Sequence, residues 1–414
     1  MKLHPVTDQP WLDPKTYWTG LSTATEQLDP PYGAIDAGAL AHNAFDMLRR
    51  ANGTTIRVAS KSVRVRGVLD AVLAIPGYAG VLSYTLAEAL WLATDSEHGK
   101  AISDVVVGYP TADRASIKRL ASSPELSARV TLMVDSTAHL DFIDSVVSPA
   151  ERETLRICLE LDASWESKLV GFTGVRRSPV HTVEQMTALA QAASKRKGFR
   201  IVGIMGYEAQ IAGQVNRPIG KPVYGVAVNW MQKNSMEELA QRRGAAVASV
   251  RTIAPLEFVN GGGTGSLERT AADASVTEIA AGSGLFGPHL FDNYTHFSPA
   301  PAAAFTLSVV RKPQPGLATL LGGGWIASGP PGPDRLPRLV WPEGLKMLPR
   351  EMAGEVQTPV SGPSAEALRI GDRVWARHTK AGEISEHLNE FAIVENGRIT
   401  EMLPTYRGQG QVFL

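Results

Sequence analysis

The feature that most constrains the fold of this sequence is a regular alternation of short apolar runs with helical patterns. The runs are rich in β-branched residues and are centred near Ile35, Ile56, Val81, Val105, Leu132, Ile157, Val202 and Phe258. Between them lie segments such as residues 38–51 and 86–96, with apolar residues three and four positions apart. This alternation is typical of parallel strands covered by helices. Eight such units predict an α/β fold with a closed (β/α)8 TIM-type barrel, and an open sheet is the alternative.

A second domain is expected because 414 residues exceed the roughly 250 that one barrel needs. After residue 285, proline and glycine become dense, and the runs FTLSVV, DRVWARH, EFAIVENGRI and QVFL are typical of strands. Asn396-Gly397 between apolar flanks predicts a tight hairpin. We therefore expect three parts. An N-terminal extension, residues 1–33, packs on the β domain; the barrel spans residues 34–285; and the C-terminal β-rich domain spans residues 286–414.

Composition and charge narrow the possible functions. Lys plus Arg and Asp plus Glu number 41 each, so no net field favours nucleic acid or an anionic membrane. Cys158 is the single cysteine and lies in an apolar run, which indicates a buried strand residue and a reducing, cytoplasmic setting. The N-terminus lacks a signal-peptide pattern, and Pro76, Gly77 and Gly80 break the longest apolar stretch. We expect a soluble protein that acts on a small molecule.

Two glycine-rich segments are candidates for binding a phosphate group. Residues 260–266, NGGGTGS, follow the last predicted strand, and barrels commonly hold phosphate in loops at that end. Glycines allow close backbone approach, the hydroxyl of Thr264 can donate, and the next helix begins directly afterwards. The candidate residues of this loop are Gly262, Gly263, Thr264 and Gly265.

The second segment, AAGSGLFG, would complete the phosphate site through the amides of Gly282, Ser283 and Gly284. The first segment, NGGGTGS, lacks the lysine of GxxxxGK[ST] and does not match GxGxxG, so a nucleoside triphosphate or dinucleotide site is not supported there. The alternative is that NGGGTGS is a glycine-rich turn without a ligand and that AAGSGLFG is a sharp exit from the barrel.

Lys61 is the candidate nucleophile. It lies in ASKSV at the end of the second predicted strand, where barrel enzymes place catalytic groups. An amine near an enclosed site loses hydration, so its neutral form is favoured and it can form a Schiff base with an aldehyde. The alternative is a solvated lysine at a strand end.

These segments together resemble the alanine-racemase-type family of pyridoxal-phosphate (PLP) barrels. PYGAIDAGALAHNAFDMLRR followed by IRVASKSVR is similar to the family's opening, which implies that Lys61 forms the Schiff base with PLP. LELDASW with GVRRSPV is similar to the stretch whose arginine contacts the phenolic oxygen of PLP, here Arg177, with Arg176 as the neighbouring alternative. GIMGYEAQ implies that Tyr207 lies beside the pyridine ring, and NGGGTGS resembles the phosphate loop.

The C-terminal part resembles the second domain of D-threonine aldolases and D-serine dehydratases. In those enzymes a His-x-Asp or His-x-Cys pair after GDRV ligates a divalent metal, whereas here the segment reads His378-Thr379-Lys380. A cationic amine cannot ligate a metal unless it is deprotonated, so this departure from the family pattern at Lys380 predicts a metal-independent enzyme. Lys380 would supply positive charge in the metal's place.

The predicted function is a PLP-dependent lyase that performs aldol cleavage or deaminating dehydration of a β-hydroxy D-amino acid. Lys61, His378 and Lys380 are the predicted catalytic residues, with His378 and Lys380 polarising the substrate hydroxyl. The alternatives are an amino-acid racemase, for which no second acid-base motif is evident, and a PLP carrier without turnover. The resemblance also implies a homodimer.

Several of these residues have simpler explanations. The alternative for His378 is a surface histidine on a strand. Three acidic residues are alternatively solvated charges: Glu351, Glu355 and Glu383. Three further residues are alternatively packing or polar residues of the barrel: Asp162, Tyr84 and Tyr294.

Overall fold

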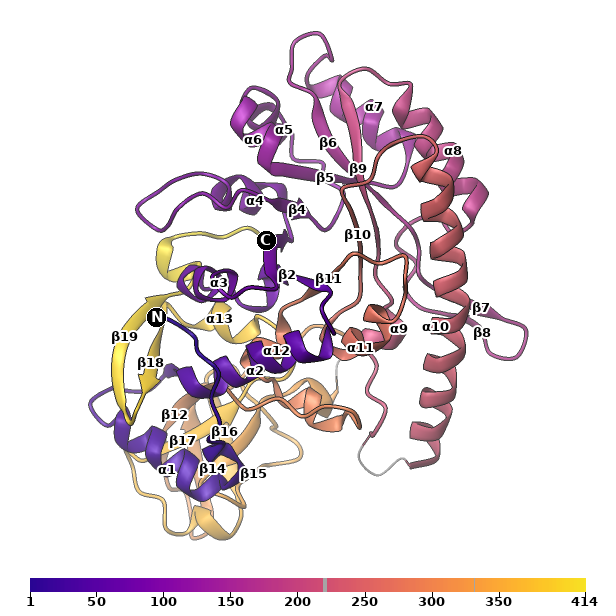
Figure 1. The fold of residues 1–414 in the computed structure, drawn as a ribbon. Helices are drawn as coiled ribbons and strands as arrows, with labels where there is room; N and C mark the ends of the chain where they lie inside the picture. Colours follow the sequence, from indigo (N-terminus) through magenta and orange to yellow (C-terminus); the bar gives the residue numbers. More distant parts are fainter. Residues whose placement is uncertain (219–221, 331) are drawn as a thin grey trace. The chain divides into compact units, whose positions relative to one another are not determined.

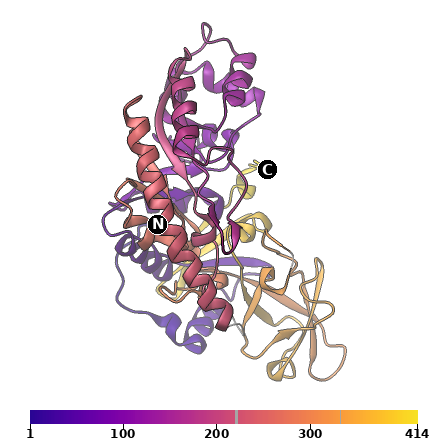
Figure 2. The same ribbon diagram turned by 90° about the vertical axis from the view of Figure 1, so that its right-hand side faces the viewer.

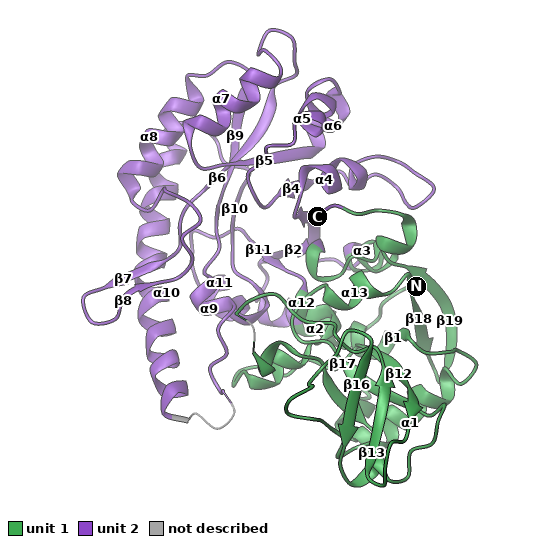
Figure 3. Cartoon of the chain, turned by 180° about the vertical axis from the view of Figure 1, so that it is seen from behind, with its two compact units in different colours: residues 1–46, 61–72, 283–412 green, residues 47–60, 73–282, 413–414 purple. Residues whose placement is uncertain are grey.

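The computed structural model describes residues 1–218, 222–330 and 332–414. The chain forms two compact units, coloured separately in Figure 3. The barrel unit comprises Met47–Ser60, Leu73–Gly282 and Phe413–Leu414, and the β-sheet unit comprises Met1–Asp46, Lys61–Val72 and Ser283–Val412. We describe each unit by itself.

The barrel unit contains a closed barrel of eight parallel strands, which confirms the predicted fold class (Figure 1). In chain order the strands are β2 (Thr55–Ala59), β3 (Tyr78–Ser83), β4 (Val105–Val107), β5 (Val130–Val134), β6 (Leu155–Glu160), β9 (Phe199–Gly206), β10 (Phe258–Gly261) and β11 (Glu278–Ala281). A core cluster that includes Met133, Cys158 and Phe258 takes side chains from several of these strands. Cys158 is therefore the buried strand residue that its apolar neighbours predict.

The prediction that the run around Ile35 is the first barrel strand is wrong. That run forms β1 (Tyr32–Asp36), which pairs with strands of the β-sheet unit. Periodicity identifies a strand but not its partner, and β11 escapes detection because it has four residues and one β-branched side chain. Lys61 thus follows the first barrel strand, NGGGTGS follows the seventh and the second glycine segment follows the eighth.

Helices follow most of the barrel strands. They are α4 (Leu86–Leu92), α5 (Arg114–Ala121), α6 (Pro124–Arg129), α7 (Thr137–Val146), α8 (Val183–Ser194), α9 (Ala209–Ala212), α10 (Pro222–Arg251) and α11 (Leu267–Ala271). Thr182 and Gln185 form a capping box that fixes the start of α8. Helix α8 packs on β9 and on the long helix α10, which Figures 1 and 2 show along one side of this unit.

The β-sheet unit is built on a nine-stranded sheet in the described part of the chain. Its strands are β1, β12 (Ala303–Arg311), β13 (Leu317–Leu321), β14 (Arg338–Trp341), β15 (Lys346–Met347), β16 (Gln357–Ser361), β17 (Arg373–Arg377), β18 (Glu390–Glu395) and β19 (Arg398–Pro404). Asn396 and Gly397 join β18 to β19 with φ angles of 52° and 74°, which confirms the predicted hairpin. The strand predicted for QVFL is wrong, because residues 411–414 are irregular.

The remaining helices of the β-sheet unit cover its sheet or link its strands. They are α1 (Pro14–Ala24), α2 (Ala37–Arg50), α3 (Arg66–Leu73), α12 (Ser283–Phe286) and α13 (Glu383–His387), of which α2 and α3 extend into the barrel unit by their last residues. Trp18 of α1 lies 5.8 Å from Trp375 of β17, measured between ring centroids, in the main core of this unit. The N-terminal segment thus packs on the sheet. Among the described residues, none of the helices is both long and apolar enough to cross a membrane.

Candidate functional site

Polar and aromatic side chains collect where the barrel strands end. Tyr109 follows β4, Asp135 follows β5, Glu160 ends β6, Tyr207 follows β9 and Gly262 follows β10. Because the strands are parallel and form a closed barrel, these residues share its C-terminal edge. This is the edge at which barrel enzymes carry out their chemistry.

Arg177 lies between two tyrosine rings of this edge. Its guanidinium carbon is 5.9 Å from the ring centroid of Tyr109 and 5.8 Å from that of Tyr207. The neighbouring Arg176 instead lies over Phe172, at 4.3 Å. Burial raises the pKa of Tyr207 to about 12, although Arg177 acts in the opposite direction, so this phenol stays protonated at neutral pH.

The glycine loop after β10 is held by a buried ionic network that the sequence interpretation missed. The amide of Gly262, which has a φ angle of +78°, donates to a carboxylate oxygen of Glu208 at 2.9 Å. Glu208 also accepts a hydrogen bond from the hydroxyl of Thr270 and lies 3.6 Å from Arg243, whose Nε donates to Asp273 at 2.9 Å. The position of Glu208, directly after Tyr207, was the only signal in the sequence.

Two glycines let neighbouring segments approach more closely than any side chain would allow. A Cβ atom at Gly263 would lie 2.9 Å from Cβ of Ala212 and 3.5 Å from a ring carbon of Tyr207. A Cβ atom at Gly282 would lie 2.3 Å from the carbonyl oxygen of Ala59, the last residue of β2. The loop after β11 therefore packs tightly against the strand that leads into Lys61.

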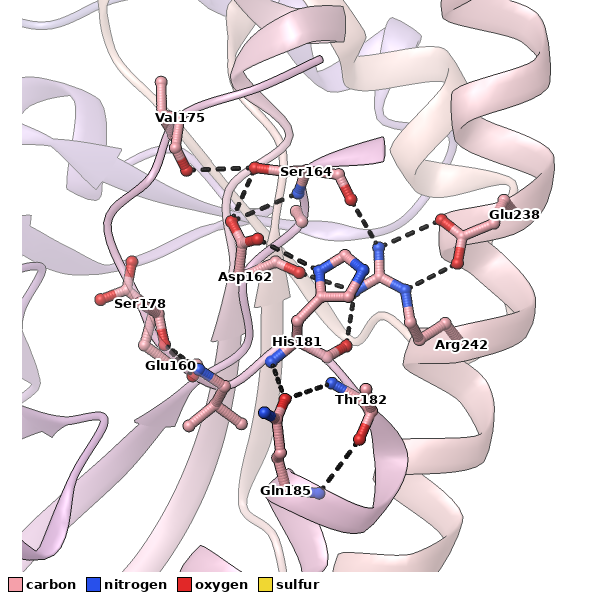
Figure 4. A network of polar contacts seen from close by, with 12 residues as sticks. Glu160, Asp162, Ser164, Val175, Ser178, His181, Thr182, Gln185, Glu238 and Arg242 are labelled. Atoms are coloured by element: carbon pink, nitrogen blue, oxygen red, sulfur yellow. Dashed lines mark hydrogen bonds and ion pairs between the residues drawn. The ribbon is translucent and has the colours of Figure 1, made fainter. Parts of the chain in front are cut away.

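Asp162 has a more specific role than packing. Its carboxylate lies 3.1 Å from Nδ1 of His181 and accepts the hydroxyl of Ser164 at 2.8 Å (Figure 4). Arg242 of α10 donates to the carbonyl oxygens of Asp162, Ser164 and His181, at 2.7 to 2.9 Å, and pairs with Glu238. This network fixes both ends of the long loop between β6 and α8.

In the β-sheet unit, the backbone at Lys61 contacts the segment that follows His378-Thr379-Lys380. A Cβ atom at Gly382 would lie 2.2 Å from the Lys61 carbonyl oxygen, and the Ser385 hydroxyl donates to the carbonyl of Val63 at 2.7 Å. The half-buried Lys61 lies in a single 3-10 turn, Ser60–Ser62. This unit therefore brings together two of the segments predicted to be catalytic.

His378 is not a surface histidine, because its side chain has no exposed area. Among the described residues, neither of its ring nitrogens has a hydrogen-bond partner. Burial lowers the pKa of His378 to about 4, against the opposing effect of Glu383, so the ring is neutral near pH 7.

Glu383 is likewise not a solvated charge. Its carboxylate accepts the amides of Thr379, Lys380 and Ala381 at 2.7 to 2.9 Å, which fixes the turn after His378. Glu351 and Glu355 are exposed, as solvated charges would be. The sequence did not decide whether Tyr84 and Tyr294 have a role beyond packing. In the structure, the ring of Tyr84 contacts that of Phe413, and Tyr294 packs against Phe291 and Phe297.

The other predicted phosphate residues, Ser283 and Gly284, lie in α12 of the β-sheet unit, where Gly284 is buried and Ser283 half-buried. Within residues 1–218, 222–330 and 332–414, no group of three or more His, Cys, Asp or Glu side chains is arranged to hold a metal ion.

Comparison with known proteins identifies several that are similar to this chain in sequence or in fold. A 3-hydroxy-D-aspartate aldolase of Paracoccus denitrificans is 27% identical over 264 residues, which cover 63% of this chain and 61% of that protein. The match thus spans less than two thirds of the curated relative. Two solved structures share the fold. D-threonine aldolase from Filomicrobium marinum has a TM-score of 0.75 and 18% identity, and the match covers 93% of this chain and 96% of that chain. D-threo-3-hydroxyaspartate dehydratase from Delftia sp. HT23 has a TM-score of 0.68 and 18% identity, and the match covers 91% of this chain and 97% of that chain.

The family described as "Alanine racemase, N-terminal domain" matches residues 35–289. That match covers more than half of the chain and includes every barrel strand. The chain therefore belongs to the alanine racemase N-terminal domain family, which is PLP-dependent.

Proposed function

We propose that this protein is a PLP-dependent lyase that cleaves or dehydrates a β-hydroxy D-amino acid. The observation that carries the proposal is the close approach of Gly282 to the end of β2, which brings the glycine segment after β11 beside the strand that continues into Lys61. The names of the similar proteins, two aldolases and a dehydratase, favour this substrate class.

The residues of the barrel edge fit PLP. The loop after β10 lies beside the one after β11, because their strands pair, and the absence of a side chain at Gly263 lets the first loop pack against Ala212. We assign the phosphate to the loop residues Gly262, Gly263, Thr264 and Gly265, while Ser283 and Gly284, which lie in α12 of the β-sheet unit, stay predictions from the sequence. Gly262 contributes the turn itself, because its amide already donates to Glu208. Arg177, rather than Arg176, would contact the phenolic oxygen, since it lies between Tyr109 and Tyr207.

When bound, PLP delocalises negative charge from the substrate α-carbon into its ring. Lys61 would hold it through a Schiff base. His378 is neutral at pH 7 and can therefore accept the proton of the substrate hydroxyl, while Lys380 supplies positive charge to the oxygen. Because a lysine stands where the resemblance places the second metal ligand, we propose that the reaction needs no divalent metal. The homodimer and the cytoplasmic location stay predictions.

The test is reconstitution with PLP followed by product analysis. We expect a yellow protein whose absorption band is lost in Lys61→Ala and kept in Lys100→Ala, a change at an exposed lysine. A panel of D- and L-amino acids then separates the reactions: aldehyde plus glycine from an aldolase, keto acid plus ammonia from a dehydratase, the opposite enantiomer from a racemase. A wild-type protein without the band would contradict the proposal.

A further inference from the structure

Glu160 is a buried carboxyl group to which neither the sequence nor the proposed mechanism gives a role. It is the last residue of β6, and Cys158, two residues earlier, belongs to the cluster inside the barrel. Because side chains alternate along a strand, Glu160 faces the same side as Cys158, one step nearer the C-terminal edge. Its side chain is 8% exposed, and its carboxylate makes no hydrogen bond to any residue in the described part of the chain.

Glu160 differs from the two carboxylates beside it. The register of β5 and β6 pairs Val134 with Leu159, so Asp135 and Glu160 follow as neighbours on adjacent strands. Nδ1 of His139 lies 3.2 Å from Asp135, and Nδ1 of His181 lies 3.1 Å from Asp162. Both aspartates therefore have an imidazole partner, and Glu160 has none.

Carboxylates this close cannot all ionise without cost, and the one without a partner binds a proton most readily. Burial and then the charge of Asp135 raise the pKa of Glu160 to about 7, with Asp162 adding to the shift and Arg177 opposing it. The other groups near this position, Tyr109 after β4 and Tyr207 after β9, are phenols that both contact Arg177. Arg177 is thus the cation that responds to the charge of Glu160.

We propose that Glu160, a buried carboxyl group beside Asp135, is a positioning residue that exchanges a proton with solvent and, through Arg177, makes the barrel's hold on the anionic oxygen of its cofactor depend on pH. When Glu160 loses its proton to water, its carboxylate competes for the positive charge of Arg177. When it regains the proton, that charge is fully available to the cofactor. This inference rests on the proposed function, and it adds a means by which pH regulates the same site.

The test compares PLP binding by wild-type protein and Glu160→Gln, whose neutral amide mimics the protonated acid. From about pH 6 to about pH 8, the dissociation constant of PLP in wild type should rise about tenfold more than in the variant. The variant at the higher pH should show the absorption band of wild type at the lower pH. The phosphate of PLP titrates too, but equally in both proteins. Glu166→Gln, at an exposed glutamate of the same loop, is the control and should behave as wild type.

Two further measurements separate the possible failures. Infrared titration of the cofactor-free protein should show a carboxyl group that ionises near pH 7 and is missing in Glu160→Gln, and Glu160→Asp should restore the pH dependence of PLP binding. A wild-type protein that forms no PLP band overturns the proposed function. A normal band whose pH dependence is the same in Glu160→Gln overturns only the role of Glu160.

Discussion

In the part of the chain that the structure describes, the barrel unit and the β-sheet unit each bury a titratable group whose side chain makes no hydrogen bond, but the two groups are of opposite type. In the barrel unit the group is an acid, Glu160, whose pKa burial raises to about 7. In the β-sheet unit it is a base, His378, whose pKa burial lowers to about 4. Loss of hydration favours the uncharged form in both cases. The units should therefore respond in opposite ways to acid.

The barrel also contains buried charges that do have partners, and breaking such a set should have the largest effect. Arg243 has no exposed area and pairs with Glu208 and Asp273, which are 0% and 3% exposed. Arg243→Met leaves two carboxylates buried together, so we expect the free energy of unfolding to fall by about 3–5 kcal/mol. Urea denaturation measures this change.

The control is Arg200→Met, since Arg200 is 56% exposed and its pair with Glu257 is worth about 1 kcal/mol or less. If the free energy of unfolding falls no more in Arg243→Met than in the control, then the ion pairs of Arg243 do not stabilise the barrel. The contrast between these paired charges and the unpaired Glu160 would then be lost.

For Glu160 we predict stabilisation on removing the charge. An acid whose pKa rises from 4.5 in the unfolded chain to about 7 in the folded one binds its proton more tightly when folded. Its contribution to the free energy of unfolding therefore falls as pH rises through this interval, by about 3 kcal/mol in all. Glu160→Gln should be more stable than wild type by about this amount at pH 8 and equally stable near pH 4. Chemical denaturation at both values checks the sign, and equal stability at pH 8 would contradict it.

For His378 the sign is reversed. Its pKa falls from 6.5 to about 4 on folding, so the unfolded chain binds the proton more tightly and stability declines as pH falls through this interval. The pKa of about 4 already includes the opposing effect of Glu383, so we expect this group to account for about 3 kcal/mol of the decline. His378→Leu should lose that much less stability between pH 7 and pH 4. His4→Leu, at an exposed histidine, should follow wild type.

Local features of both units were predictable from the sequence, and long-range ones were not. The hairpin at Asn396-Gly397 follows from residues that accept positive φ angles, and the barrel strands other than β11 follow from β-branched runs. Which sheet β1 joins is decided by packing, since Gly33 leaves space that Leu388 and Phe391 occupy.

The candidate site divides in the same way. The resemblance pointed to Lys61, Arg177, Tyr207 and the glycine loop through motifs that are contiguous in sequence. Glu208 and Arg243 are 35 positions apart and meet only through the packing of α10 on the barrel, so neither has a local signature. The environment of Glu160 is set by Asp135 after β5 and by Asp162 and Arg177 in the loop after β6. The hydrophobic periodicity of the sequence does not predict that these groups lie near it.

The smallest expected effect concerns Lys380, the charged residue two positions from the neutral His378. If its ammonium stabilises negative charge on the substrate hydroxyl, as we propose in place of a metal ion, Lys380→Met should lower turnover about tenfold, because a single mobile donor stabilises an oxyanion less than a fixed one does. Its backbone amide still donates to Glu383, so the turn itself should persist. Exhaustive chelation should leave wild-type turnover unchanged. Full activity in Lys380→Met would refute the role of the ammonium, and activity lost on chelation and restored by manganese or zinc would show that a metal acts there after all. Either result would leave the opposite responses of Glu160 and His378 to acid unaffected, since burial is the largest cause of both pKa shifts.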